Sequence, residues 1–206
     1  EEKELSNNFK QNFLKEMEDE MFSHPKIKNS NGSSFSENKS NFIFANSIGF
    51  CNGYHTSSYS VFCEALAEEN GQMERDYEIS VSRFYKDLDD AKTIGKLAAE
   101  KAAKRLGAKK IDSGKMPVIF HKRVAKSLLS TFASAITGSS FARGTSFLKD
   151  SLGKNIFSKE INIIDDPLIK KGLASQAFDS EGVKNQKINL VKEGKFVNLL
   201  LDTYNS

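Results

Sequence analysis

Residues 115–145 read KMPVIFHKRVAKSLLSTFASAITGSSFARGT, and this stretch decides how the rest of the chain is interpreted. A short apolar run at 118–120 follows a proline, which predicts the start of a buried strand. Behind it an apolar residue recurs at every fourth position, which predicts an amphipathic helix. The apolar stripe of this helix consists of Val124, Leu128, Phe132 and Ile136. Gly138 follows the stripe, where we expect the helix to end in a left-handed cap.

The first part of the chain predicts a helix, a loop and then strands. Residues 1–22 have helical apolar spacing, and Pro25 follows them. Residues 29–40 are rich in Asn, Ser and Gly, which predicts a loop or connector. Beyond that loop, runs of apolar or alternating residues predict strands at 42–45, 50–51, 54–66 and 77–85.

Glycines mark the turns of this first part. Asn52-Gly53 predicts either a tight turn or a bulge within a long strand. A corner at 69–71 would join the last two strands into a meander. A second amphipathic helix is expected over 90–106, capped by Asp89 or Asp90 and followed by Gly107.

The second part of the chain is predicted to be richer in strands. Residues 108–115 predict a linker, so we place a domain boundary between 112 and 113. The helix that carries the apolar stripe, called the central helix below, is followed by a predicted strand at 160–164. After that strand we expect a hairpin at 187–201 that turns at Glu193-Gly194. The predicted fold class is α+β: an antiparallel sheet with flanking helices in 1–112, followed by the start of a second β-rich domain in 113–206.

The composition indicates a globular protein without a charge-based preference for a polymer. Of 206 residues, 38% are hydrophobic and 28% are charged, and 30 basic residues stand against 27 acidic ones. This balance does not indicate binding to nucleic acid or to a membrane. No apolar run reaches membrane-spanning length and no signal peptide is visible, so we expect a cytoplasmic protein.

Four further runs, in order, resemble the TldD/PmbA peptidase family, and specifically its PmbA branch, also called TldE. They are AEENGQMERDY at 67–77, SFLKDSLGK at 146–154, KGLAS at 171–175 and FDSEGV at 178–183. The resemblance extends from about Asn41 onward and is weaker before it. It implies an internal segment of a longer protein. Residues 1–112 would be the carboxy-terminal part of an N-terminal α/β domain, and 113–206 the first part of a β-rich C-terminal domain.

The resemblance also implies what the central helix does not carry. A TldD-like chain has an H-E-x-x-x-H pattern on this helix, with a zinc ion on the histidines and the glutamate as general base. Here the replaced positions are Ser130, Thr131 and Ala135. We therefore expect no catalytic residue and no metal in this chain, with zinc held by a TldD-like partner subunit.

The same resemblance suggests a set of residues for binding a peptide or a partner. They are Arg143, Ser146, Phe178, Asp179, Ser180, Glu181 and Gly182. Arg143 can pair a peptide carboxylate bidentately, or equally pair with Asp150 or Glu181. Asp179 can instead fold back onto its own backbone in an Asx-turn.

Two other groups of residues are open to a structural or a chemical interpretation. Cys51 and His55 would share a face of one strand, but Cys63 would reach them only if the chain folded back. These residues are either two free cysteines or part of a disulfide or zinc site. The acidic residues around Gly71 can serve acid–base chemistry or solubility; they are Glu68, Glu69, Glu74 and Asp76.

Two functions are compatible with these patterns. The first is a PmbA/TldE-like subunit of a TldD/TldE-type zinc metalloprotease that processes unfolded or leader peptides. The alternative is a truncated, non-catalytic remnant or an independent peptide- or protein-binding module. In either case we expect no nucleic acid and no membrane as partner.

Overall fold

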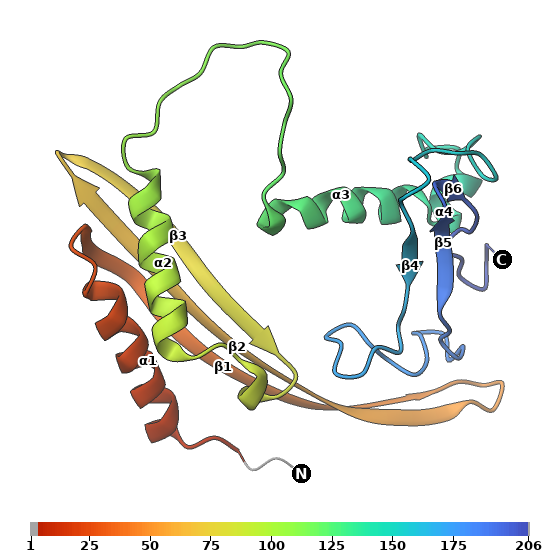
Figure 1. The fold of residues 1–206 in the computed structure, drawn as a ribbon. Helices are drawn as coiled ribbons and strands as arrows, with labels where there is room; N and C mark the ends of the chain where they lie inside the picture. Colours follow the sequence, from red (N-terminus) through yellow and green to blue (C-terminus); the bar gives the residue numbers. More distant parts are fainter. Residues whose placement is uncertain (1–3, 206) are drawn as a thin grey trace. The chain divides into compact units, whose positions relative to one another are not determined.

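The computed structural model describes residues 4–205 and divides into two compact units, Glu1–Asp112 and Ser113–Ser206 (Figure 1). Both units combine helices with small antiparallel sheets, which confirms the predicted α+β class. Residues 108–121 between them form neither helix nor strand, in agreement with the predicted linker at 108–115. Within residues 4–205, no helix is both long enough and apolar enough to cross a bilayer.

The first unit is a three-stranded meander with two helices on one face (Figure 1). Its strands are β1 (Ile27–Ala45), β2 (Cys51–Glu69) and β3 (Gln72–Ser82), in the order β1-β2-β3. The turn before β3 uses Asn70 and Gly71, both with positive φ, as expected for the corner at 69–71.

Helices α1 (Asn7–Phe22) and α2 (Ala91–Arg105) begin at side-chain caps. Ser6 accepts a hydrogen bond from the Phe9 amide at 3.2 Å, and Asp90 accepts one from the Thr93 amide at 2.9 Å. The short 3-10 helix η1 (Tyr85–Asp87) connects β3 to α2. The cap at Asp90 confirms one of the two predicted starts of the second helix.

The core of the first unit lies between the helices and one face of the sheet. Alternate residues of β2 are fully buried there, whereas their neighbours face the other side. The helices contribute two methionines and several small residues to the same core. Its members include Met17, Met21, Val61, Cys63, Ala65, Ile94, Ala98 and Ala102.

The predicted loop at 29–40 is wrong, because these residues form most of β1. Their backbones pair with β2 almost continuously, from Ser30 opposite Ala65 to Ser40 opposite Thr56. Because many of these side chains are polar, the composition of the segment predicted a loop. Backbone pairing with a neighbouring strand, however, does not require apolar side chains. Gly53 is likewise neither a turn nor a bulge, since it pairs regularly with Ile43.

The second unit contains two helices and a second three-stranded antiparallel sheet. The helices are α3 (Lys122–Ala135) and α4 (Gly138–Ala142). The strands are β4 (Ile163–Asp165), β5 (Ile188–Lys192) and β6 (Lys195–Phe196). The predicted hairpin turn is confirmed, with Glu193 and Gly194 both at positive φ, although its second arm is shorter than expected and β4 begins only at Ile163.

The core of the second unit is built around the carboxy-terminal end of α3. Phe132 is 7% exposed and Ile136 is fully buried, and both pack with Leu190, Val191 and Phe196. The amino-terminal half of the predicted stripe is not buried, because Val124 and Leu128 are each 52% exposed. Only the last part of the helix therefore contributes to this core.

Two predictions about the ends of this helix are wrong. Residues 118–120 are not a strand but exposed coil, with Ile119 96% exposed. Gly138 is not a left-handed cap, because it begins α4 and lacks a positive φ. A side chain at Gly138 would meet Cβ of Asn205 at 2.7 Å, so a close approach explains the glycine.

Candidate functional site

A hollow of about 440 Å³ lies in the second unit where α3 meets α4 and the turn that follows. Six of its eight lining residues carry hydroxyl groups, and the other two are an alanine and a phenylalanine. The lining consists of Ser130, Thr131, Ser134, Ala135, Ser140, Thr145, Ser146 and Phe147. All three replaced positions of the metal pattern are thus part of one surface.

A network of short-range hydrogen bonds closes the chain around this hollow. Thr137 caps α4 by accepting from the Ser140 amide at 3.3 Å, and the Ser140 hydroxyl donates to the Ser134 carbonyl at 3.1 Å. The Thr145 amide donates to the Ser140 carbonyl at 3.0 Å, next to Gly144 with φ 67°. These bonds return the chain toward α3, which places Thr145 beside residues fifteen positions earlier.

Two of the lining hydroxyls on α3 donate hydrogen bonds to carbonyl groups of their own helix. The Ser130 hydroxyl donates to the Lys126 carbonyl at 3.2 Å, and the Thr131 hydroxyl donates to the Ser127 carbonyl at 2.9 Å. Both side chains are exposed, and their oxygens retain acceptor capacity for a ligand. The hollow can therefore offer neutral hydrogen-bonding groups, but its lining contains no carboxylate, imidazole or thiol.

Ser146 is the predicted binding residue that the structure brings to the hollow. It is 6% exposed, and its hydroxyl accepts a hydrogen bond from the Leu148 amide at 3.0 Å. Arg143 caps the end of α4 two residues before Thr145 and is exposed. Within residues 4–205, no ion pair joins Arg143 to Asp150 or Glu181, the two structural partners considered for it.

The run from Phe178 to Gly182 does not line this hollow. The predicted Asx-turn is present, because the Asp179 carboxylate accepts from the amides of Glu181 at 2.9 Å and Val183 at 2.8 Å. Phe178 is 4% exposed, and Glu181 accepts from both the amide and the hydroxyl of Thr203 at 2.9 Å. Ser180 is exposed and Gly182 supplies a positive φ of 84°. A role for this run in binding stays a prediction.

Sequence reasoning did not assemble four lining residues into this site: Ser134, Ser140, Thr145 and Phe147. A partial signal was available, because hydroxyl residues at 130, 131 and 134 share one face of a helix. The residues after α4 gave no such signal, since only the turn at Gly144 brings them to α3.

The structure does not bring Cys51, His55 and Cys63 together. All three lie on β2, and the twelve residues from Cys51 to Cys63 span ~40 Å of extended strand. Cys51 is exposed, whereas Cys63 is buried with its sulfur 3.4 Å from the Met21 sulfur. In residues 4–205, no group of three or more His, Cys, Asp or Glu side chains could hold a metal ion.

Three of the acidic residues around Gly71 form ion pairs with nearby basic residues. Glu69 pairs with Lys26 at 2.9 Å, and Arg105 of α2 lies 3.4 Å from Glu74 and 3.6 Å from Asp76. The two contacts of Arg105 connect α2 to β3. They favour the structural interpretation of this acidic cluster.

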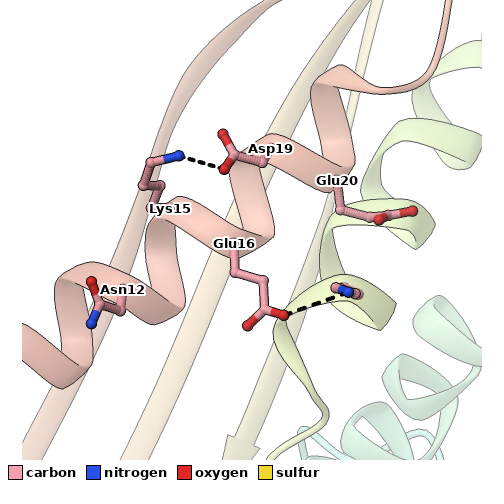
Figure 2. Close-up of a pocket in the computed structure, with 6 residues that line it drawn as sticks. Asn12, Lys15, Glu16, Asp19 and Glu20 are labelled. Atoms are coloured by element: carbon pink, nitrogen blue, oxygen red, sulfur yellow. Dashed lines mark hydrogen bonds and ion pairs between the residues drawn. The ribbon is translucent and has the colours of Figure 1, made fainter.

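A second hollow, of about 370 Å³, lies beside α1 in the first unit (Figure 2). Figure 2 shows Lys15 directed toward Asp19. The Lys15 nitrogen lies 2.5 Å from an Asp19 carboxylate oxygen, and Glu16 forms an ion pair of 3.8 Å with Lys92. All four side chains are more than half exposed, so these pairs contribute little to stability. The charged side chains of these two ion pairs neutralise each other within each pair. They therefore do not form a common binding point for a ligand.

Comparisons with known proteins agree with this architecture. The central-domain model of the PmbA/TldA metallopeptidases matches residues 1–106, and their C-terminal-domain model matches residues 113–206. A crystal structure from Bacteroides thetaiotaomicron has a TM-score of 0.90 at 27% identity, over 98% of this chain and 46% of that one. TldE from Thermococcus kodakarensis, at 20% identity and a TM-score of 0.76 over the same shares, has the same fold.

Among curated proteins, metalloprotease PmbA of Escherichia coli O157:H7 is 38% identical over 88% of this chain and 40% of its own length. A PmbA homologue of Buchnera aphidicola, strain Bp, has the same identity and coverage. The fold is therefore that of a two-unit α+β segment of a metallopeptidase. The chain belongs to the PmbA/TldD metallopeptidase family, and it spans about 40% of the length of these curated relatives.

Proposed function

We propose that this chain is the PmbA/TldE-like subunit of a TldD/TldE-type zinc peptidase that acts on unfolded or leader peptides in the cytoplasm. In this proposal a TldD-like partner subunit supplies the zinc ion and the general base. This chain supplies peptide-binding surface at the hollow formed by α3, α4 and the turn after them.

The observation that carries the proposal is the chemistry of the hollow at the replaced metal positions. Ser130 and Thr131 are exposed on α3, and Ala135 lies on the same lining. Hydroxyl groups can bind the amide and carbonyl groups of an extended peptide, but they neither hold zinc tightly nor serve as a general base at neutral pH. A surface of this kind suits peptide binding better than catalysis by this chain alone.

Co-purification with a TldD-like protein, followed by a peptidase assay, tests the proposal. We expect the mixture to hydrolyse an unfolded peptide and to lose this activity when a chelator removes zinc. The chain alone should be inactive. Hydrolysis by the chain alone that resists chelators would contradict the proposal, because it would require a non-metal nucleophile.

The second candidate is a non-catalytic remnant or an independent binding module. The neighbouring reading frames discriminate between the two candidates. A PmbA-like continuation together with a TldD-like gene elsewhere favours the peptidase subunit, whereas their absence favours the binding module. An interaction assay with the TldD-like protein then gives the decisive result.

A further inference from the structure

The segment that forms the hollow has an unusual charge. Residues 113–149 contain no acidic residue, although the chain as a whole has 27. The same segment contains six basic residues: Lys115, Lys122, Arg123, Lys126, Arg143 and Lys149. All eight lining residues of the hollow belong to this segment. The next acidic residue along the chain is Asp150, directly beyond its end.

Three of these basic residues lie next to the lining along the chain. Lys126 is one helical turn before Ser130, and its carbonyl accepts the Ser130 hydroxyl. Arg143 falls between the lining residues Ser140 and Thr145, and Lys149 lies two residues after Phe147. All three are exposed, and none takes part in an ion pair within residues 4–205. Their charges are therefore available to attract an anionic ligand.

We propose that this hollow selects acidic segments of unfolded peptides, that is, stretches rich in Asp and Glu. The hydroxyl groups of the lining would bind peptide amides and carbonyls, while Lys126, Arg143 and Lys149 attract the side-chain carboxylates. This inference rests on the proposed function and adds a substrate preference to it. An anionic lipid surface also carries negative charge, but a flat membrane would not fill a hydroxyl-lined hollow of about 440 Å³.

Fluorescence polarisation with three labelled, unstructured peptides tests the proposal. The peptides share length and apolar content, and carry several carboxylates, no charge, or several lysines. The full chain should bind the acidic peptide about tenfold more tightly than the lysine peptide at low salt, since each exposed charge pair contributes modestly. The difference should shrink when salt shortens the Debye length from about 30 Å to about 10 Å.

A triple variant and a matched control assign the preference to this segment. Lys126→Gln, Arg143→Gln and Lys149→Gln together should abolish the preference, so that the acidic peptide and the lysine peptide bind with equal affinity. The control replaces three exposed lysines of the same unit outside the lining, Lys159, Lys170 and Lys192, with Gln and removes the same net charge. This control should keep most of the preference.

Each other outcome overturns a defined claim. Equal affinity for the three peptides, or equal effects of the two triple variants, overturns the acidic preference and leaves the proposed function standing. Failure to bind any peptide, in the presence of a TldD-like partner as well, overturns the proposed function. Binding to phosphatidylserine vesicles but to no peptide would assign the basic segment to a lipid surface instead.

Discussion

Gly95 on α2 faces the backbone of α1 at Met17, so closely that there is no space for a side chain between them. A side chain at position 95 would overlap the Met17 carbonyl oxygen, and its Cβ would also lie 3.1 Å from the Met17 carbonyl carbon and 3.2 Å from the Met21 amide nitrogen. Because all three neighbours are backbone atoms, no side chain can move aside. Gly95 therefore sets the distance between the two helices that cover the sheet.

Gly95→Ala should destabilise the first unit. In an ordinary helix interior this change stabilises by about 1 kcal/mol, but here the methyl group must push the helices apart, which typically costs about 1–3 kcal/mol. Chemical denaturation followed by circular dichroism measures the net effect. Lys96→Ala, at the exposed neighbouring position, is the control and should change stability by less than about 0.5 kcal/mol. An unchanged or raised midpoint for Gly95→Ala would show that the helices can separate freely.

Phe132→Ala should cost about 3–5 kcal/mol, because the ring is buried in the core of the second unit. The ring lies 5.8 Å from that of Phe157 and 6.0 Å from that of Phe196, both edge-on. Its burial confirms that Phe132 is a core residue. Leu128→Ala, on the same stripe but 52% exposed, is the matched control and should cost far less. Equal losses in a thermal melt would contradict this division of the stripe.

Glu37 should make the stability of the first unit depend on acid pH. Its buried carboxylate forms ion pairs with two lysines: the side-chain nitrogen of Lys10 lies 2.7 Å from one carboxylate oxygen, and that of Lys39 lies 3.1 Å from the other. Burial raises the pKa of Glu37, but hydrogen bonds and charges from the two lysines outweigh it and hold the pKa below its ordinary value of 4.5. A lowered pKa means that the folded state binds this proton less readily than the unfolded state. The stabilisation is therefore complete above about pH 4.5 and is lost as the pH falls through the folded pKa.

Urea denaturation of Glu37→Gln across this pH range measures that contribution. The variant should be less stable than the parent chain at pH 7, and the gap should narrow as the pH falls below about 4.5. Glu16→Gln is a suitable control, because its contact with Lys92 is exposed and 3.8 Å long. A constant gap between Glu37→Gln and the parent at all pH values would assign the loss to packing.

The two cysteines should differ in reactivity. Burial is the main cause that raises the pKa of the Cys63 thiol, and the residue is fully buried, so little reactive thiolate forms. Cys51 is exposed at the start of β2. A chromogenic disulfide reagent should therefore modify one thiol quickly in the folded chain and the second only after denaturant is added. Rapid modification of both, or a pair protected by oxidation, would contradict the assignment of two free cysteines.

The chain should bind no stoichiometric zinc, and Ser130→His, Thr131→Glu and Ala135→His together should create measurable zinc affinity. Ser130 and Thr131 are exposed, so larger side chains have room at these two positions. Ala135 also lines the hollow but is only 7% exposed, so a histidine there must turn its ring into the hollow. The variant restores the TldD ligand spacing on one helix. Metal analysis after dialysis and a thermal melt check both parts. Tightly held zinc in the unchanged chain would contradict the prediction that it binds none. Loss of the fold in the triple variant would contradict the prediction that the variant gains zinc affinity.

Local patterns in the sequence were sufficient for the elements with strong periodicity or a defined turn. The spacing of apolar residues predicted α2 and α3, and Glu193-Gly194 predicted the turn between β5 and β6. These features depend on interactions between residues a few positions apart, so the local sequence contains their cause. The resemblance of four separate runs likewise indicated the family without knowledge of the fold.

Contacts between distant residues decided the rest. Residues 29–40 are polar enough for a loop and become a strand only because β2 offers its backbone for pairing. Residues 118–120 are apolar enough for a strand but have no strand beside them. The hollow also depends on tertiary structure, since hydrogen bonds from Ser140 and Thr145 return the chain to α3. The sequence by itself determined which side chains were available, and only the folded backbone determined which of them share a surface.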